Sequence, residues 1–250
     1  MQNTVLGIDI GGTGIKGAPV DIHTGELLAE RHWLATPQPA TPEAVGVVIA
    51  QMVEHFGWQG LIGCTFPAVV HQSKTLSAAN VDQSWLNAPA ESLLATAAKC
   101  PLVLLNDADA AGLAEATFGA ARGLRGNILV ITLGTGIGSA LIANGQLVSN
   151  TELGHLLYPG SDDAEKYCSA KVKTDQNLDW PEYNRRLNGY LLYVQTLFSP
   201  DLIIIGGEIS RAADQFIPHM QGMRCPIIPA ELKNEAGIIG AALAAAQQKP

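Results

Sequence analysis

The sequence predicts an α/β fold, in which buried strands alternate with helices along the chain. Short runs of mainly apolar residues predict strands, and they occur at residues 4–10, 102–105, 128–133 and 202–205. Stretches with apolar residues at helical spacing, or rich in alanine, predict helices at residues 42–56, 107–121, 180–198 and 236–247. Glycine-rich segments directly follow the first and third strands, which predicts a sharp turn at both places.

The composition predicts a folded globular protein with a sizeable core. Of 250 residues, 47% are hydrophobic and only 15% are charged, which disfavours disorder. The formal net charge is −8 without long basic runs, so nucleic-acid and membrane partners are not expected. The sequence shows neither a secretory signal pattern nor an apolar run of membrane length, and its four cysteines are widely spaced. These features predict a cytoplasmic protein in a reducing compartment.

The chain carries a weak internal repeat, whose first copy begins near the N-terminus. The strand at residues 4–10 contains one acid, Asp9, and leads into Gly11-Gly12-Thr13-Gly14. A second strand is predicted at residues 15–20, and a third at 26–29 after a turn near Gly25.

The second copy starts about 120 residues later. The strand at residues 128–133 has Thr132 in the place of Asp9 and leads into Gly134-Thr135-Gly136-Ile137-Gly138. A second strand at 139–143, an Asn144-Gly145 turn typical of hairpins, and a third strand at 146–148 follow. Two similar halves joined head to tail are the simplest explanation of the repeat.

The two glycine loops predict a phosphate-binding site. Glycine tolerates positive φ and lets an anion approach the main chain, so two such loops would clamp a phosphate chain between backbone N–H groups. Asp9, at the end of its strand, would then hold Mg²⁺ directly or through water. The alternative is two ordinary tight hairpins with Asp9 as a solvated acid. One hairpin alone favours that alternative, whereas the pair, each with a threonine in its loop, favours phosphate binding.

Three further motifs each allow a functional and a structural interpretation. The strand at residues 102–105 delivers Asn106 and Asp107 to its carboxyl end, where Asp107 would act as a general base or cap the following helix. Glu152 and His155 are three residues apart, so they would share one face of a helical turn. This pair would hydrogen-bond a polyol, contribute to a metal site or simply start a helix. Gly207 would either form a strand-to-helix turn or lie beside a phosphate donor.

In their order along the chain, five motifs resemble those of the ROK sugar kinases, which belong to the actin and hexokinase superfold. The motifs are Asp9-x-Gly-Gly-Thr-x-x-Lys16, Asn106-Asp107, Leu133-Gly-Thr-Gly-x-Gly138, Glu152-Leu-Gly-His155 and Gly206-Gly207. The resemblance implies a two-lobed, actin-like (ribonuclease H-like) α/β fold with a duplicated unit and a cleft between the lobes. It implies an N-terminal lobe at residues 1–108, a C-terminal lobe at 109–235, and a final helix at 236–249 that packs back on the N-terminal lobe.

Other segments look like the polyphosphate glucokinase branch of this family, and they lie at residues 66–70, 78–85, 197–202, 226–230 and 234–240. The cysteine-rich zinc loop that ROK kinases carry after His155 is missing, because residues 158–174 contain only Cys168. No structural zinc is therefore expected, and something else must brace the sugar loop. Glu208 stands where the family commonly has a third glycine, which disfavours ordinary ATP binding there.

Carried over position by position, the resemblance implies a role for each motif residue. Asp107 matches the catalytic base, and the sugar ligands are matched by Asn80, Asn106, Glu152, His155 and Glu165. The phosphate-binding positions are matched by Asp9, Gly11, Gly12, Thr13, Lys16, Thr132, Gly134, Thr135, Gly136 and Gly207, with Asp9 also the expected Mg²⁺ residue.

The resemblance implies transfer of the terminal phosphate of polyphosphate, or of ATP, to the 6-hydroxyl of glucose or a close hexose. The alternatives are a strictly ATP-dependent ROK hexokinase and a non-catalytic sugar-sensing regulator. A regulator is less expected, because the first loop strand begins by Thr4 and leaves no room for a DNA-binding segment before it. Relatives commonly dimerise, so a homodimer is expected.

A polyphosphate chain would need a basic track. The basic residues that gather most closely are Lys166, Lys171, Lys173, Arg185 and Arg186, with Arg122 and Arg125 elsewhere. Acids are interspersed among them, so a track and a solvated face of mixed charge are equally good interpretations.

Overall fold

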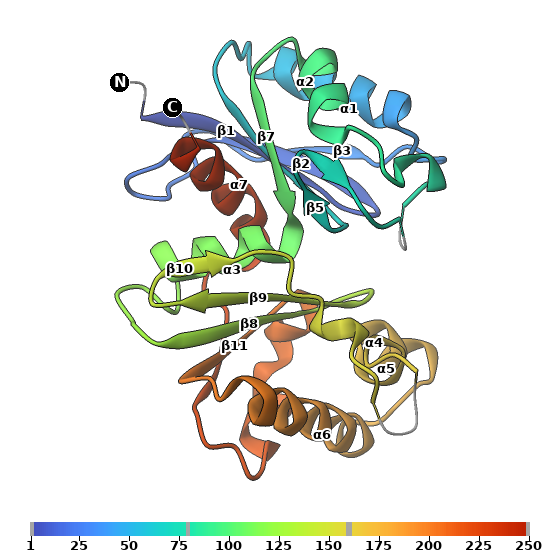
Figure 1. The fold of residues 1–250 in the computed structure, drawn as a ribbon, viewed down its shortest axis with the longest axis vertical. Helices are drawn as coiled ribbons and strands as arrows, with labels where there is room; N and C mark the ends of the chain where they lie inside the picture. The colour runs from blue at the N-terminus through green and yellow to red at the C-terminus, as the bar shows by residue number, and fades with distance from the viewer. Residues whose placement is uncertain (1–2, 79–80, 159–161, 249–250) are drawn as a thin grey trace. The chain divides into compact units, whose positions relative to one another are not determined.

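The computed structural model describes residues 3–78, 81–158 and 162–248, and it divides into two compact units (Figure 1). The first unit comprises Met1–Ala114 and Glu235–Pro250, and the second comprises Glu115–Asn234. The division falls inside helix α3 (Asp107–Thr117), in which the boundary expected from the sequence, between residues 108 and 109, also lies. Among the described residues, no helix has the length and apolar character that crossing a bilayer requires.

The first unit is built on a five-stranded sheet of order β3-β2-β1-β4-β7. The strands are β1 (Thr4–Ile10), β2 (Gly14–Asp21), β3 (His32–Ala35), β4 (Ile62–Phe66) and β7 (Leu102–Asn106). The first three are antiparallel neighbours, whereas β4 and β7 run parallel to β1. The carboxyl ends of β1, β4 and β7 therefore meet at one edge of the sheet, which is where such sheets bind ligands.

Helices cover both faces of this sheet because the side chains of β1 alternate. Leu6 and Ile8 point into a core formed with α1 (Pro42–His55) and α2 (Ala90–Ala98). Gly7 faces the other way, and a Cβ there would collide with the backbone of Ile238 in α7 (Ala236–Gln247). The glycines on this face thus let α7, red in Figure 1, lie directly on the strands.

The remaining elements of the first unit are short. They are β5 (Val70–His71), β6 (Lys74–Thr75) and the 3-10 turn η1 (Gln83–Trp85). Asp82 caps η1, since its carboxylate accepts a hydrogen bond from the Ser84 N–H at 2.9 Å. The turn buries Trp85 against Phe66, with ring centroids 4.5 Å apart.

The second unit repeats the topology with a sheet of order β10-β9-β8-β11-β12. Its strands are β8 (Asn127–Leu133), β9 (Ile137–Ala143), β10 (Gln146–Val148), β11 (Leu202–Gly206) and β12 (Ile227–Pro229). Again three antiparallel strands are followed by two that run parallel to the first. The internal repeat predicted from the sequence is confirmed at the level of strand order and direction.

One face of the second sheet is covered by α6 (Trp180–Phe198). Its buried hydrophobic residues recur at three and four, and they are Tyr183, Leu187, Tyr190, Leu191 and Val194. The other helical segments are short: α4 (Glu165–Cys168), α5 (Ala170–Asp175) and the 3-10 segments η2 (Leu153–His155), η3 (Glu208–Gln215), η4 (Ile217–His219) and η5 (Lys233–Glu235).

The third strand of the first copy is not where the sequence predicted it. Residues 26–29 form only an isolated bridge between Val20 and Leu27, and the third strand is β3. The Leu28 N–H donates to the Pro19 carbonyl at 2.8 Å, but Pro19 has no N–H to return the bond. The ladder therefore does not continue at residues 26–29, and β3 pairs with the first half of β2.

Candidate active site

The first glycine loop joins β1 to β2 in three residues. The Gly11 N–H donates to the Gly14 carbonyl at 3.0 Å, and the Thr36 hydroxyl donates to the Gly11 carbonyl at 2.6 Å. Gly12 and Thr13 are exposed at the tip, and no described heavy atom lies within 4 Å of a Cβ built on Gly12. The tip is thus held from behind and open to an approaching anion.

Asp9 is fixed by its neighbours on both adjacent strands. Its antiparallel partner is Lys16 and its parallel partner is Thr65. One carboxylate oxygen accepts from the Thr65 hydroxyl at 2.7 Å, and the other pairs with the Lys16 ammonium at 3.1 Å. The structure therefore gives Lys16 a definite contact, which is neutralisation of Asp9.

Asn106 and Asp107 lie where β7 passes into α3. The amide oxygen of Asn106 accepts from the N–H groups of Ala108, at 2.8 Å, and Asp109, at 3.1 Å, which is the pattern of a helix N-cap. Asp107 accepts a local bond from the Ala108 N–H in the same turn, at 2.8 Å, and is exposed. Asn106, rather than Asp107, is therefore the main cap of α3, and the Asp107 carboxylate faces solvent.

Asp107 and the first loop lie at the same edge of the sheet. Asp9, Thr65 and Leu105 are in register across β1, β4 and β7, so Gly11 and Asp107 each follow that row by two residues. With neighbouring strands about 4.8 Å apart, the two positions are separated by roughly 10 Å across the sheet. Asn80, the expected sugar contact of this unit, lies outside the described residues.

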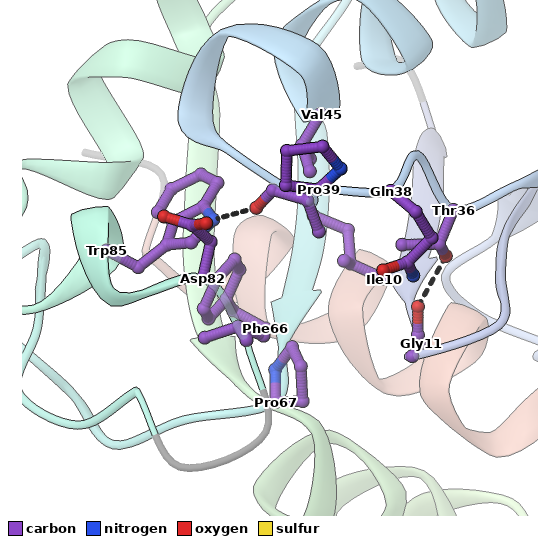
Figure 2. A pocket seen from close by; sticks show the side chains of 13 residues that line it. Ile10, Gly11, Thr36, Gln38, Pro39, Val45, Phe66, Pro67, Asp82 and Trp85 are labelled. Atoms are coloured by element: carbon purple, nitrogen blue, oxygen red, sulfur yellow. Dashed lines mark hydrogen bonds between the residues drawn. The ribbon is translucent and has the colours of Figure 1, made fainter.

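A pocket that sequence reasoning did not find lies beside the first loop (Figure 2). It encloses about 260 Å³, below the usual size of sites for drug-sized ligands, and therefore suits a small one. Gly11 and Gly12 form part of its wall, together with the apolar Phe66 and Trp85 and the acid Asp82. The Trp85 indole N–H donates to the Ala40 carbonyl at 2.7 Å, which fixes the aromatic wall.

The second glycine loop joins β8 to β9 and is also closed by a backbone hydrogen bond within the loop. The Gly134 N–H donates to the Gly136 carbonyl at 3.0 Å, and the Lys171 N–H donates to the Gly134 carbonyl at 3.0 Å. Thr135 is exposed at the tip. Glu165 lies against the loop, since its carboxylate accepts from the Ile137 N–H at 3.3 Å and a Cβ on Gly136 would collide with it.

Two more predicted donor-site residues gather at this loop. Thr132 pairs in register with Gly206 at the end of β11. The next residue, Gly207, has φ +82° and packs so closely on Leu133 that a Cβ would overlap the backbone there. The structure thus brings Thr132 and Gly207 together with the second loop.

Glu152 and His155 share a face, as their spacing predicted. Glu152 precedes the 3-10 turn η2 and His155 ends it, with a carboxylate oxygen of Glu152 3.8 Å from His155 Nε2. The turn is seated on β9, because the Leu153 N–H donates to the Ser139 hydroxyl at 3.1 Å and Gly154 packs against Ile137. Burial raises the pKa of Glu152; the negative charge of Glu165 adds to this effect and His155 opposes it.

Asp163 is a site residue that sequence reasoning missed. Its carboxylate lies 3.1 Å from His155 Nδ1, on the side of the ring away from Glu152. Burial alone would lower the pKa of His155, but the hydrogen bond with Asp163 and the charges of Glu165, Asp163 and Glu152 together raise it. The only sequence signal was a second acid two residues before Glu165.

Ligand atoms of His155, Asp163 and Glu165 lie within 4.8 Å of one another, so these side chains form a polar group able to bind a polyol or to hold a metal ion. The metal interpretation of Glu152 and His155 lacked partner ligands in the sequence, and Asp163 and Glu165 are the groups the fold brings to the histidine.

The basic residues considered as a track have local partners. Lys171 pairs with Asp175 at 2.6 Å, and Arg185 and Arg186 both pair with Glu182 at 2.8 Å. Lys166 lies 3.9 Å from Asp163, and Lys173 donates to the Leu178 carbonyl at 2.9 Å. This pairing favours the interpretation as a face of mixed charge.

The sequence pattern of the ROK family matches residues 5–173. The chain belongs to the ROK family. A polyphosphate glucokinase of Mycobacterium tuberculosis (strain CDC 1551 / Oshkosh) is 46% identical over 244 residues, which are 97% of this ROK chain and 91% of that protein.

Solved structures agree with that assignment. The inorganic polyphosphate/ATP-glucomannokinase of Arthrobacter sp. strain KM superposes with a TM-score of 0.95 at 49% identity, covering 99% of this chain and all of that one. A ROK family glucokinase of Streptomyces griseus, in complex with glucose and AMPPNP, has a TM-score of 0.82 at 25% identity, covering 98% of this chain and 99% of that one. These likenesses confirm the expected actin-like α/β fold class.

Replacing Asp163 with asparagine is expected to lower the pKa of His155, because the charged acceptor at Nδ1 is lost. Since the raised folded-state pKa means that protonated His155 stabilises the fold, this contribution is present below the ordinary value of 6.5 and is lost as the pH rises through the raised one. Asp163→Asn should therefore cost more stability at about pH 5.5 than at about pH 8.5.

NMR titration of the histidine ring protons and denaturant unfolding at the two pH values measure these effects. Asp162→Asn, at the neighbouring exposed acid, is the matched control and should leave the pKa of His155 nearly unchanged. An unaltered His155 titration in Asp163→Asn would contradict the assigned pair.

Proposed function

We propose that this chain is a polyphosphate-dependent glucokinase, which transfers the terminal phosphoryl group of polyphosphate to the 6-hydroxyl of glucose. The choice of donor and sugar rests on relatives with that activity in their names, which align along nearly the whole chain. The observation that carries the reaction type is the exposed Asp107 carboxylate, at the same sheet edge as the first glycine loop.

Asp107 acts as the general base in this proposal. Its carboxylate accepts the proton of the 6-hydroxyl while the hydroxyl oxygen attacks the terminal phosphorus in line. The bond from that phosphorus to the bridging oxygen breaks, and a polyphosphate one unit shorter leaves. Asn106 holds Asp107 in place, because its amide caps α3 and also donates to the Ala68 carbonyl at 3.2 Å.

The glycine loops bind the donor through backbone N–H groups. The residues assigned to this task are Gly11, Gly12, Thr13, Thr132, Gly134, Thr135, Gly136 and Gly207. N–H groups held rigidly by the sheets stabilise charge on the transferred group without reorganising, which is where most of the rate acceleration arises.

Mg²⁺ fits at Asp9 only through its hydration shell. Both carboxylate oxygens already have protein partners, Thr65 and Lys16, so a water-held ion suits the donor set better than a directly bound one. When bound there, Mg²⁺ would neutralise charge on the phosphate chain. Lys16, at 3.1 Å from Asp9, keeps that acid from repelling the donor.

Hydrogen bonding with the sugar is assigned to Glu152, His155 and Glu165, and to Asn106 and Asn80. Asn106 uses one amide hydrogen for Ala68, so its sugar contact falls to the second hydrogen. Carboxylates and an imidazole suit a polyol, whose hydroxyls both donate and accept. The protein is further proposed to act as a homodimer in the cytoplasm.

An ATP-dependent hexokinase is the second candidate. It is favoured by the Arthrobacter protein, which is named for both donors, and by the Streptomyces griseus glucokinase complex with AMPPNP. Glu208, exposed beside Gly207, disfavours it by placing an acid next to the second loop. A sugar-sensing regulator would have no need of an exposed base at Asp107.

Steady-state rates with pure polyphosphate and with pure ATP, at saturating glucose and Mg²⁺, distinguish these functions. The proposal expects polyphosphate to support turnover with glucose, and a sugar panel that includes mannose defines the acceptor. Turnover with ATP alone would establish the second candidate, and glucose binding without turnover on either donor would establish a sensor.

Asp107→Asn is expected to keep glucose binding but to lose about 10²–10⁴-fold in kcat, the usual range for loss of a general base. Binding is measured by calorimetry without donor, and turnover by coupled assay. Asp175→Asn, which alters an exposed acid paired with Lys171, is the control and should keep full turnover. Near-normal kcat in Asp107→Asn would remove Asp107 from the role.

A further inference from the structure

The one-turn helix α4 begins with Glu165, two residues after Asp163, so its position fixes two of the acids around His155. A helix of four residues cannot hold itself together, because nucleation is unfavourable without tertiary contacts. Its N-cap residue, Ala164, has no capping side chain, and local side-chain support comes from a bond of the Glu165 N–H to the Asp163 carboxylate at 3.2 Å. Contacts with the rest of the second unit must therefore determine where α4 lies.

One of these contacts is apolar. Cys168 at the end of α4 is fully buried in the core beneath α6. Burial raises its pKa to about 12 despite the opposing charge of Arg186, so the thiol stays neutral and packs as a small apolar group. This contact anchors one end of the turn but leaves its rotation about Cys168 undetermined.

Arg186 of α6 supplies a directional contact. Its Nη1 donates to the Tyr167 backbone carbonyl at 3.2 Å, and its guanidinium lies over the Tyr167 ring, 4.9 Å from the centroid. The same nitrogen donates to the Gln176 side chain at 3.0 Å, and Nε donates to Glu182 at 2.8 Å. One planar group thus links α4, the end of α5 and α6.

The support behind Arg186 is rigid. The helix α6 runs for 19 residues, and Asp179 caps its first turn by accepting from the Glu182 N–H at 2.9 Å. The Arg186 side chain is only 16% exposed, which limits screening of its contacts by water.

Arg185, the next residue, provides an internal comparison. It pairs with the same acid at the same distance, and it donates to the Tyr167 hydroxyl at 3.3 Å. Its side chain is 64% exposed, and its bond to Tyr167 is to the side-chain tip rather than to the backbone. Arg185 therefore contributes little to fixing the position of α4.

We propose that Arg186 is a positioning residue for the sugar ligands, holding α4 so that Asp163 and Glu165 meet His155 and the start of β9. The inference rests on the proposed function, in which His155 and Glu165 bind the sugar. It also identifies what braces this part of the chain, where the sequence lacks the cysteines of a zinc loop. A lysine would not replace Arg186, because a single ammonium cannot stack on Tyr167 and donate to three acceptors in a plane.

The test compares Arg186→Met, which keeps the apolar stem but removes the guanidinium, with Arg185→Met and Tyr167→Phe. Glucose affinity is measured by calorimetry without donor, so that no polyphosphate contact enters, and kcat is measured at saturating substrates. Arg186→Met should weaken glucose binding on the order of 10- to 100-fold, the usual cost of a misplaced ligand set, with a smaller loss in kcat. Both controls should bind glucose as the wild type does.

The outcomes separate this inference from the proposed function. A folded Arg186→Met protein that binds glucose with wild-type affinity overturns the inference, even if its melting temperature is lower than that of the wild type. If Arg186→Met does not fold, Arg186→Lys decides, with weakened glucose binding expected and wild-type binding contradicting the role. A wild-type protein that binds no glucose overturns the proposed function, and the inference with it.

Discussion

Each sheet places a three-residue, glycine-rich turn after its central strand, and the backbone of that turn closes on itself. The Gly11 N–H donates to the Gly14 carbonyl and the Gly134 N–H to the Gly136 carbonyl, both at 3.0 Å, and the Thr36 hydroxyl also holds the Gly11 carbonyl of the first turn. No described atom comes within 4 Å of a Cβ at Gly12 or Gly134. The strands on both sides hold these turns rigid, which is what preorganised N–H donors require. The proposed chemistry depends on this arrangement occurring twice.

The two turns have different neighbouring residues, which suit different ligands. Beside the first, the acid Asp9 is neutralised by Lys16 and held by Thr65, which suits contact with phosphate and a hydrated cation. Beside the second, the Glu165 side chain accepts a hydrogen bond from the Ile137 N–H and lies close to His155 and Asp163. The second turn therefore adjoins a polar group suited to a sugar.

The sequence was sufficient for features that follow from local pattern. The repeat, the glycine turns and the bounds of α6 and α7 were predictable, because strand periodicity and helix signals are written in neighbouring residues. The sequence placed the third strand of the first copy at residues 26–29. Pro19 cannot donate to a ladder there, and the strand that pairs with β2 is β3. The contacts of Asp163 and Arg186 were not predicted, because they arise only when separate elements pack. The sequence indicated Asn106 and Asp107 as a pair, but only the structure shows that Asn106 caps the helix and that Asp107 is exposed.

Titration of [¹⁵N]glycine-labelled protein with inorganic tripolyphosphate and Mg²⁺, followed by NMR, tests the central claim that both turns bind the donor. The account predicts shifts in the amide signals of Gly11, Gly12, Gly134 and Gly136, while Gly57 and Gly222, in turns outside both loops, stay in place. Shifts confined to other glycines, or none at saturating tripolyphosphate, would contradict it.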